Sequence, residues 1–330
     1  MNRPVRISAR TGVAPHQRSA PSQPGVAAAP TRGPRRRGPG RANRRTLFWV
    51  ALFGAPALLL MAVFLVYPVV QSFRFSIYDW DGIGKATPIG LGNYRELVAD
   101  ALFRKVVRNS LFLAVLGTVG SMLVGLLWAY GIERRLPGWR AYRFLLFIPV
   151  IMPITVSALL WALMLDVQGP VNQLIGFFGV DLPPDWLGDY RVAPWVVVFV
   201  AIWQASGFTM LIILGAMEDV PAELHDAGSL DGANALRRLT SIVIPYIRGT
   251  LGTLTIVQFI GLLKAFDIVF ALTAGGPGNA TDVLGTYLVQ KAFAEGRYGY
   301  GSAVAVGMTL IMLVISVVFY RRLLGKDNEQ

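Results

Sequence analysis

Residues 218–245 read EDVPAELHDAGSLDGANALRRLTSIVIP and separate two long apolar segments of the chain. Asp219 can cap a first helix. Asp231-Gly232 is a turn signal, and we expect Gly232 to adopt a positive φ angle. Residues 233–243 can form a second helix. The stretch therefore predicts two short helices joined by a tight turn, a structure suited to docking on another molecule.

The segments on either side of this stretch are long enough to cross a membrane. The chain has 330 residues, 54% hydrophobic and 15% charged, whereas soluble domains carry about 25% charged residues. A membrane-spanning helix needs about 20 apolar residues. The sequence therefore predicts an all-α, polytopic membrane protein with six transmembrane helices, at 47–70, 110–132, 144–165, 194–215, 251–273 and 303–319.

The amino-terminal residues differ sharply from the rest. Residues 1–45 contain eleven Arg and no acidic residue, and the remainder carries 20 basic and 19 acidic residues. A basic, Pro- and Gly-rich segment of this kind is typical of disorder. We interpret 1–45 as a cytoplasmic tail that contacts anionic lipid, in preference to a nucleic-acid-binding arm. Residues 46–330 form the predicted transmembrane domain.

Charge asymmetry predicts the orientation. With both termini in the cytoplasm, the inner segments hold 17 Lys and Arg residues when the tail is counted only from Arg32 onward, and the outer segments hold 9, as the positive-inside rule requires. Arg104, Lys105 and Arg108 disagree, because they lie outside. Apolar residues recur at helical spacing in 93–107, so we expect an amphipathic helix there, lying on the outer membrane surface with its charges in water.

The spacing within 218–245 resembles the EAA loop of binding-protein-dependent ABC permeases, with Asp226, Gly228 and Ile244 as conservative departures from that pattern. In that family the loop is a coupling helix that inserts into a cleft on an ATPase subunit. The resemblance implies that ATP and Mg are bound by this partner, that the chain itself is no enzyme, and that it binds no cofactor. The implied coupling residues are Glu223, Asp226, Ala227, Gly228, Asp231, Gly232 and Ala233.

A second stretch is similar to sugar permeases of the maltose, lactose and glycerol-phosphate type. This stretch comprises residues 266–281. The similarity is shared by residues 90–94, 108–110 and 169–172, and in total it covers about 47–325. The resemblance implies a type I ABC importer permease fold in the bacterial inner membrane. It further implies a second, homologous permease as heterodimer partner, two ATPase subunits and an extracytoplasmic solute-binding lipoprotein.

Polar and aromatic side chains within the spans are candidates for the substrate path. Aromatic faces pack against the C–H patches of sugars, and amides donate and accept hydrogen bonds. Interhelical packing by the amides is the alternative for each. The two helices that flank 218–245 line the sugar site in the resembling permeases, which favours the path. The candidates are Trp203, Gln204, Phe208, Gln258 and Leu262.

Other classes of function find less support in the residues. The chain has no Cys and only His16 and His225, so thiolate and His-rich metal sites are excluded. It has no Gly-rich phosphate loop, no clustered carboxylates of a membrane transferase, and no internal repeat of a secondary transporter. Lys264 and Asp267 are interpreted as a structural ion pair. A permease for glycerol phosphate or an amino acid, and a sensor or scaffold without transport, remain as alternatives.

Overall fold

The computed structural model describes residues 44–135, 137–180, 184–319 and 321. These residues belong to two units, divided between residues 59 and 60. Most of the predicted tail, 1–43, lies outside the described residues. Residues 44 and 45 already belong to helix α1 (Arg44–Met61), which contains Pro56.

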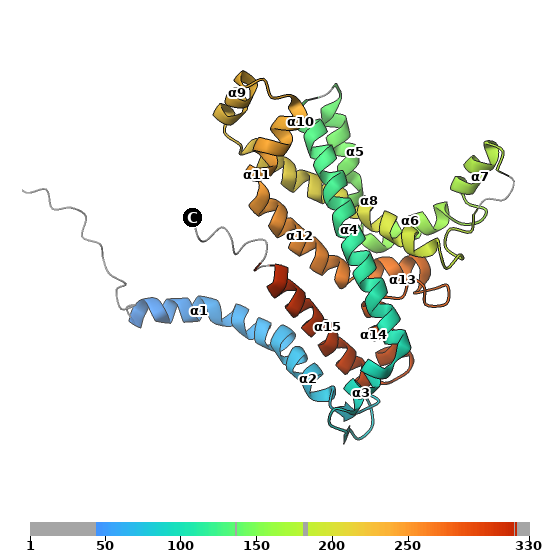
Figure 1. Ribbon diagram of the computed structural model, residues 1–330. Coiled ribbons are helices and arrows are strands. Elements are labelled where there is room, and N and C mark those ends of the chain that lie inside the picture. Colours follow the sequence, from blue (N-terminus) through green and yellow to red (C-terminus); the bar gives the residue numbers. More distant parts are fainter. Residues whose placement is uncertain (1–43, 136, 181–183, 320, 322–330) are drawn as a thin grey trace, which may run out of the picture. The chain divides into compact units, whose positions relative to one another are not determined.

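Helices are the main elements of the second unit in its described residues (Figure 1). The strands among these residues form one two-residue antiparallel hairpin, β1 (Tyr78–Asp79) with β2 (Thr87–Pro88). The longest helices are α4, α8 and α15. The helical elements are η1 (Ala62–Val66), α2 (Tyr67–Phe75), α3 (Gly92–Ala99), α4 (Ala101–Glu133), α5 (Trp139–Ile151), α6 (Ile154–Met164), α7 (Pro170–Phe177), α8 (Ala193–Glu218), α9 (Ala222–Leu230), α10 (Ala235–Arg238), η2 (Leu239–Val243), α11 (Ile244–Tyr246), α12 (Arg248–Leu263), α13 (Asp267–Thr273), α14 (Leu284–Val289), η3 (Gln290–Ala294) and α15 (Tyr298–Phe319), where η marks π-helical turns.

Four helical segments of the described chain are long and apolar enough to cross a membrane alone: Leu52–Phe75, α4, α8 and Tyr298–Val318. Two bent pairs bring the number to six when each counts as one span. One pair is α5 with α6, which meet at 102°, and the other is 235–246 with α12, which meet at 73°. The predicted polytopic all-α architecture is therefore confirmed.

The third predicted span, 144–165, is broken where α5 ends and α6 begins. In a continuous helix the carbonyl of Pro149 would accept a hydrogen bond from residue 153. That residue is a proline, which has no N–H. Gln204 of α8 replaces the missing donor, because its Nε2 donates to the carbonyls of Pro149 at 2.7 Å and Met152 at 3.1 Å. The break is thus stabilised by a side chain from another helix.

The fifth predicted span, 251–273, is wrong in its extent. Helix α12 ends at Leu263, and α13 is a separate short helix that begins at Asp267. Residues 264–266 have no helical assignment beyond a turn at Lys264. The apolar run that suggested one span therefore contains a break that its composition does not show.

The predicted surface helix at 93–107 is also wrong. Asp100 has an extended backbone (φ −68°, ψ 116°) and caps α4 by accepting from the N–H of Leu102. The stretch is therefore divided between α3 and the first turns of α4. Its apolar face packs inside the protein rather than on lipid, because Leu97 and Val106 are buried in a cluster with Tyr287 and Tyr300.

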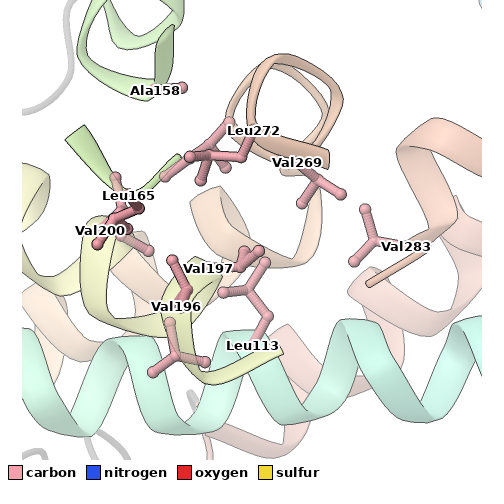
Figure 2. Close-up of a cluster of buried hydrophobic side chains, with 12 residues drawn as sticks. Leu113, Ala158, Leu165, Val196, Val197, Val200, Val269, Leu272 and Val283 are labelled. Carbon is pink, nitrogen blue, oxygen red and sulfur yellow. The ribbon is translucent and has the colours of Figure 1, made fainter. Parts of the chain in front are cut away.

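The core lies where α4 and α8 pack along each other, with α12 and α13 against them. Glycines on α4 allow the close approach: a Cβ atom at Gly120 would lie 2.2 Å from Ile202, and one at Gly125 2.7 Å from Thr209. Figure 2 shows the apolar cluster at one end of this packing, where Leu113 of α4, Val197 and neighbouring valines of α8, and Leu272 of α13 converge.

Candidate functional site

The loop at 218–245 contains the two predicted short helices. Helix α9 begins at Ala222, after Pro221, and Glu223 lies in its first turn, where its charge opposes the positive end of the helix dipole. Asp219 is not its cap. Pro221 holds an extended conformation, so the helix starts two residues later than expected, and Asp219 instead ends α8.

The turn between these helices is tight, as predicted. Gly232 has φ +70°, a conformation that most L-residues avoid. Its N–H bonds to the carbonyl of Ser229 at 3.1 Å, and the N–H of Ala233 bonds to the carbonyl of Gly228 at 2.9 Å. Asn234 then caps α10 by accepting from the N–H of Arg237, so the second helix begins at Ala235 and continues through η2.

Gly228 is the contact point between the two arms of this loop. Helix α9 lies so close to η2 that a Cβ atom at Gly228 would be 2.6 Å from the side chain of Ile242. Arg238 Nη1 also donates to Ser229 Oγ at 2.8 Å. The loop is therefore a folded hairpin of helices with a defined shape, rather than a loose linker.

Most residues that the resemblance assigns to coupling face solvent in this chain. Gly228 is buried and Ala233 is half-buried, and the other five are exposed. Apolar side chains accompany them: Leu230 is 89% exposed and Leu236 is 64% exposed. A folded loop that leaves leucines in water presents a surface on which a partner can bury apolar area.

A cavity of about 300 Å³ lies between α8, α12 and the break that follows α12. Three of the five predicted path residues line it: Gln204, Gln258 and Leu262. The other two do not. Trp203 packs edge-on against Trp161 of α6, with ring centroids 5.5 Å apart, and Phe208 is 43% exposed away from the cavity lining.

Each cavity amide uses its nitrogen within the protein. Gln204 Nε2 holds the α5–α6 break, and Gln258 Nε2 donates to Thr209 Oγ1 at 2.8 Å. No described donor reaches Gln204 Oε1, which is buried without a hydrogen-bond partner. Gln258 Oε1 likewise has no donor among the described residues. The described residues therefore leave two amide oxygens from different helices without a donor, and hydroxyl groups are donors of the kind that such acceptors bind.

Sequence reasoning missed part of the cavity lining. The predicted ion pair between Lys264 and Asp267 is wrong, because no such contact lies within 4 Å in the described part of the chain. Lys264 instead caps the end of α12 and Asp267 lies in the first turn of α13, where each charge suits its helix terminus. Their position at the break between α12 and α13 is the feature that could have identified them as lining residues. The remaining lining residues are Ile154, Ala201, Ala205, Gly261, Ala265, Phe266 and Ile268.

Comparisons with known proteins agree with this arrangement. A probable ABC transporter permease of Pyrococcus horikoshii is 33% identical over 270 residues, which cover 81% of this chain and 92% of that protein. The diacetylchitobiose uptake permease of Streptomyces coelicolor is 31% identical over 301 residues, covering 85% of each. Such relatives confirm the predicted resemblance to sugar-uptake permeases.

A solved structure shows the same fold. The crystal structure of a bacterial alginate ABC transporter, in complex with an alginate pentasaccharide-bound periplasmic protein, contains a chain that superposes with a TM-score of 0.73 at 21% identity. The match covers 84% of this chain and 95% of that one, and it confirms the predicted importer permease fold. Residues 121–324 match the family described as "Binding-protein-dependent transport system inner membrane component". The chain therefore belongs to this family of multi-pass membrane permeases.

Proposed function

We propose that this chain is the permease subunit of an ATP-driven importer and that it translocates a sugar delivered by an extracytoplasmic solute-binding lipoprotein. The cavity carries this proposal. Two glutamine oxygens, from Gln204 and Gln258, have no donor among the described residues, and sugar hydroxyl groups are donors of the right kind. The printed names of the relatives, which include a diacetylchitobiose uptake permease, support a carbohydrate substrate.

The charge of the cavity favours a neutral solute. Lys264 and Asp267 both line it and their formal charges cancel. A phosphate ester carries one to two negative charges that a single lysine beside a carboxylate would balance poorly. Glycerol phosphate or another polar solute is therefore the second candidate. Amino acids, which carry both charges, would fit the pair better than phosphate esters, but they make less use of the free amide oxygens.

The partners follow from the loop at 218–245. Its exposed leucines and carboxylates would dock on an ATPase subunit, and two such subunits would hold ATP and Mg. One loop of this kind provides one docking surface, so a second, homologous permease would supply the other. The charge asymmetry of the sequence supports an orientation in the bacterial inner membrane with both termini in the cytoplasm, surrounded by lipid.

The experiment is sugar uptake by cells that carry the Gln258→Ala variant. Loss of one hydrogen bond to a sugar hydroxyl should cost about 1–3 kcal/mol, roughly tenfold to a hundredfold in affinity at the cavity. Uptake should fall accordingly, whereas capture of sugar by the binding lipoprotein should not change. Gln290→Ala, on the exposed π-helical turn η3, is the matched control and should transport normally.

Gln204→Ala removes both roles of Gln204 at once, the acceptor oxygen at the cavity and the donor at the α5–α6 break. Its amide nitrogen also satisfies the α5–α6 break, so we expect both lower uptake and a lower melting temperature. Normal uptake by both glutamine variants would show that the sugar passes elsewhere. Misassembly of both would show that the amides only pack helices together.

A further inference from the structure

Three basic residues at the start of α4 contradict the positive-inside rule, and the structure gives two of them a partner. Arg104 Nη1 donates to the carbonyls of Val98 and Ala99, at 2.9 and 3.1 Å, and so closes the end of α3. Lys105 Nζ donates to the carbonyl of Gly278 at 2.8 Å. Arg108 is exposed and has no hydrogen bond or ion pair within the described chain. An unpaired arginine on the outer side therefore needs another explanation.

Arg108 lies in a groove of about 530 Å³ at the predicted outer ends of α4 and α8. One wall is α4, with Lys105 and Asn109, and the opposite walls are the segment that leads into α8 and the loop between α13 and α14. Tyr190, which is 61% exposed, also lines the groove, and its hydroxyl accepts from Arg191 Nε at 2.9 Å. No acidic residue lines it.

The carboxylates nearest in sequence to the groove are already engaged. Asp185 and Asp189 accept from backbone N–H groups of their own turn, those of Gly188 and Arg191. Asp282 is buried below and accepts from Thr286 and Asn279. Burial raises the pKa of Asp282, and the charge of Lys105 acts against that rise. Of the two cations that line the groove, Lys105 is thus partly balanced, and Arg108 has no counter-charge among the described residues.

The walls of the groove are fixed before any partner arrives. Asn109 Nδ2 donates to the carbonyls of Asn279, Ala280 and Asp282, at 3.3, 3.1 and 3.0 Å. These bonds tie the loop between α13 and α14 to α4. Because the walls are already ordered, binding to them costs little conformational entropy.

We propose that this groove receives a carboxylate-bearing loop of the extracytoplasmic binding protein, with Arg108 as the residue that pairs with the acid. The proposal rests on the proposed function. A guanidinium recognises a carboxylate through two parallel hydrogen bonds, and exposed tyrosines are common at protein interfaces. The groove shares no lining residue with the cavity that holds Gln204 and Gln258, and its amide, Asn109, has used its donors. Both features favour a protein acid over a sugar as the occupant.

The test measures docking of the binding protein on the complete importer in lipid nanodiscs, at about 50 and 300 mM salt. The probe is the binding protein encoded with this permease. Arg108→Glu should weaken docking at low salt by tenfold or more and should flatten its salt dependence, since the attraction becomes a repulsion. Arg108→Lys should retain part of the affinity. The control is Arg95→Glu, an equal charge change at an exposed residue of α3 outside the groove.

The outcomes separate this inference from the function on which it rests. If the unaltered importer does not dock the binding protein, the proposed function is wrong. Docking that is unchanged in Arg108→Glu, with normal docking of the unaltered protein, overturns the inference alone. An effect confined to uptake of an acidic sugar such as galacturonate, with docking intact and galactose uptake normal, overturns it in favour of a substrate contact. Unchanged basal ATPase activity and melting temperature should accompany the expected result.

Discussion

Two loops of this permease differ in how far their side chains are buried. Loop 218–245 leaves three leucines in water, Leu224, Leu230 and Leu236, with Leu230 at 89% exposure. Loop 274–287 buries its residues from Thr281 to Leu284, including the carboxylate of Asp282. Both turn on residues with positive φ, Gly232 in the first and Gly275 and Gly278 in the second. Turn chemistry alone therefore does not distinguish a loop with exposed leucines from one that is buried against the rest of the chain.

Hydrogen bonds to the rest of the protein make the difference. In loop 274–287, Asp282 accepts from Thr286 and Asn279, and Ser110 of α4 accepts from the N–H of Leu284 at 2.8 Å. Tyr287 donates to Asp100 at 2.5 Å, and burial raises the pKa of its hydroxyl. In loop 218–245 the described side-chain bonds stay within the loop, such as Arg238 to Ser229. Loop 218–245 is anchored to α4 and α8 by apolar packing of Val220, Leu239 and Val243 instead. A loop with buried hydrogen bonds to the rest of the protein should govern stability, and a loop with exposed leucines should govern partner contact.

The largest effect on stability should come from Asp282→Ala. The change removes the buried carboxylate that accepts from Thr286 and Asn279, and Thr286 keeps only the carbonyl of Val283 as acceptor. Loss of these hydrogen bonds should cost about 1–3 kcal/mol. The melting temperature of the purified protein should fall. The matched variant Asp231→Ala, an exposed carboxylate in loop 218–245, should melt as the unaltered protein does. Equal melting temperatures for the two variants would remove the proposed distinction between the loops.

A smaller change in free energy, with a larger change in transport, is expected for Gly232→Val. Nothing lies within 4 Å of a Cβ atom at Gly232, so a clash cannot explain an effect there. The left-handed backbone alone costs an L-residue about 1–2 kcal/mol. We expect uptake and co-purification of the ATPase to fall while membrane insertion stays normal and the melting temperature falls less than it does for Asp282→Ala. Gly232→Asn, whose side chain tolerates this conformation, should retain most activity, and uptake that survives valine would contradict a coupling role for the turn.

The smallest effect concerns the pH dependence of stability. Arg297 donates to both carboxylate oxygens of Glu96, at 2.8 and 2.7 Å, and this bonding lowers the pKa of Glu96 below its usual 4.5. A lowered carboxyl pKa stabilises the fold at neutral pH, and the contribution is lost as pH falls below 4.5 toward the folded-state value. Both side chains are largely exposed, so the contribution is about 0.2–1 kcal/mol.

Melting curves of the unaltered protein and Glu96→Gln check this pH dependence. The two proteins should differ at pH 7 and converge in acid. Glu223→Gln in loop 218–245 is the control, since its carboxylate makes no described ion pair. A difference between the unaltered protein and Glu96→Gln that persists in acid would show that Glu96 acts through packing rather than through its charge.

The features that the sequence predicted correctly depend mainly on residues close together in the chain. Apolar runs predicted where the membrane helices lie. A helix needs about 20 apolar residues to cross the bilayer, and it satisfies its backbone hydrogen bonds within that segment. The Asp231-Gly232 pair predicted the turn, because glycine adopts positive φ without a steric penalty. The spacing of 218–245 predicted the family. Each of these signals is contained within a short stretch of chain.

Only the tertiary structure decided the features that depend on a distant donor or a distant wall. Pro149 and Pro153 were visible in the sequence. Whether the helix breaks there depends on a donor from another helix that satisfies the free carbonyls, as Gln204 of α8 does. Residues 93–107 have an amphipathic pattern that suits lipid or a protein core equally, and burial against Tyr287 and Tyr300 decided between them. Gln204 and Gln258 share a cavity because α8 and α12 approach each other there. Periodicity predicts whether a residue has apolar or polar surroundings. Which surface supplies those surroundings is determined by packing between segments far apart in the chain.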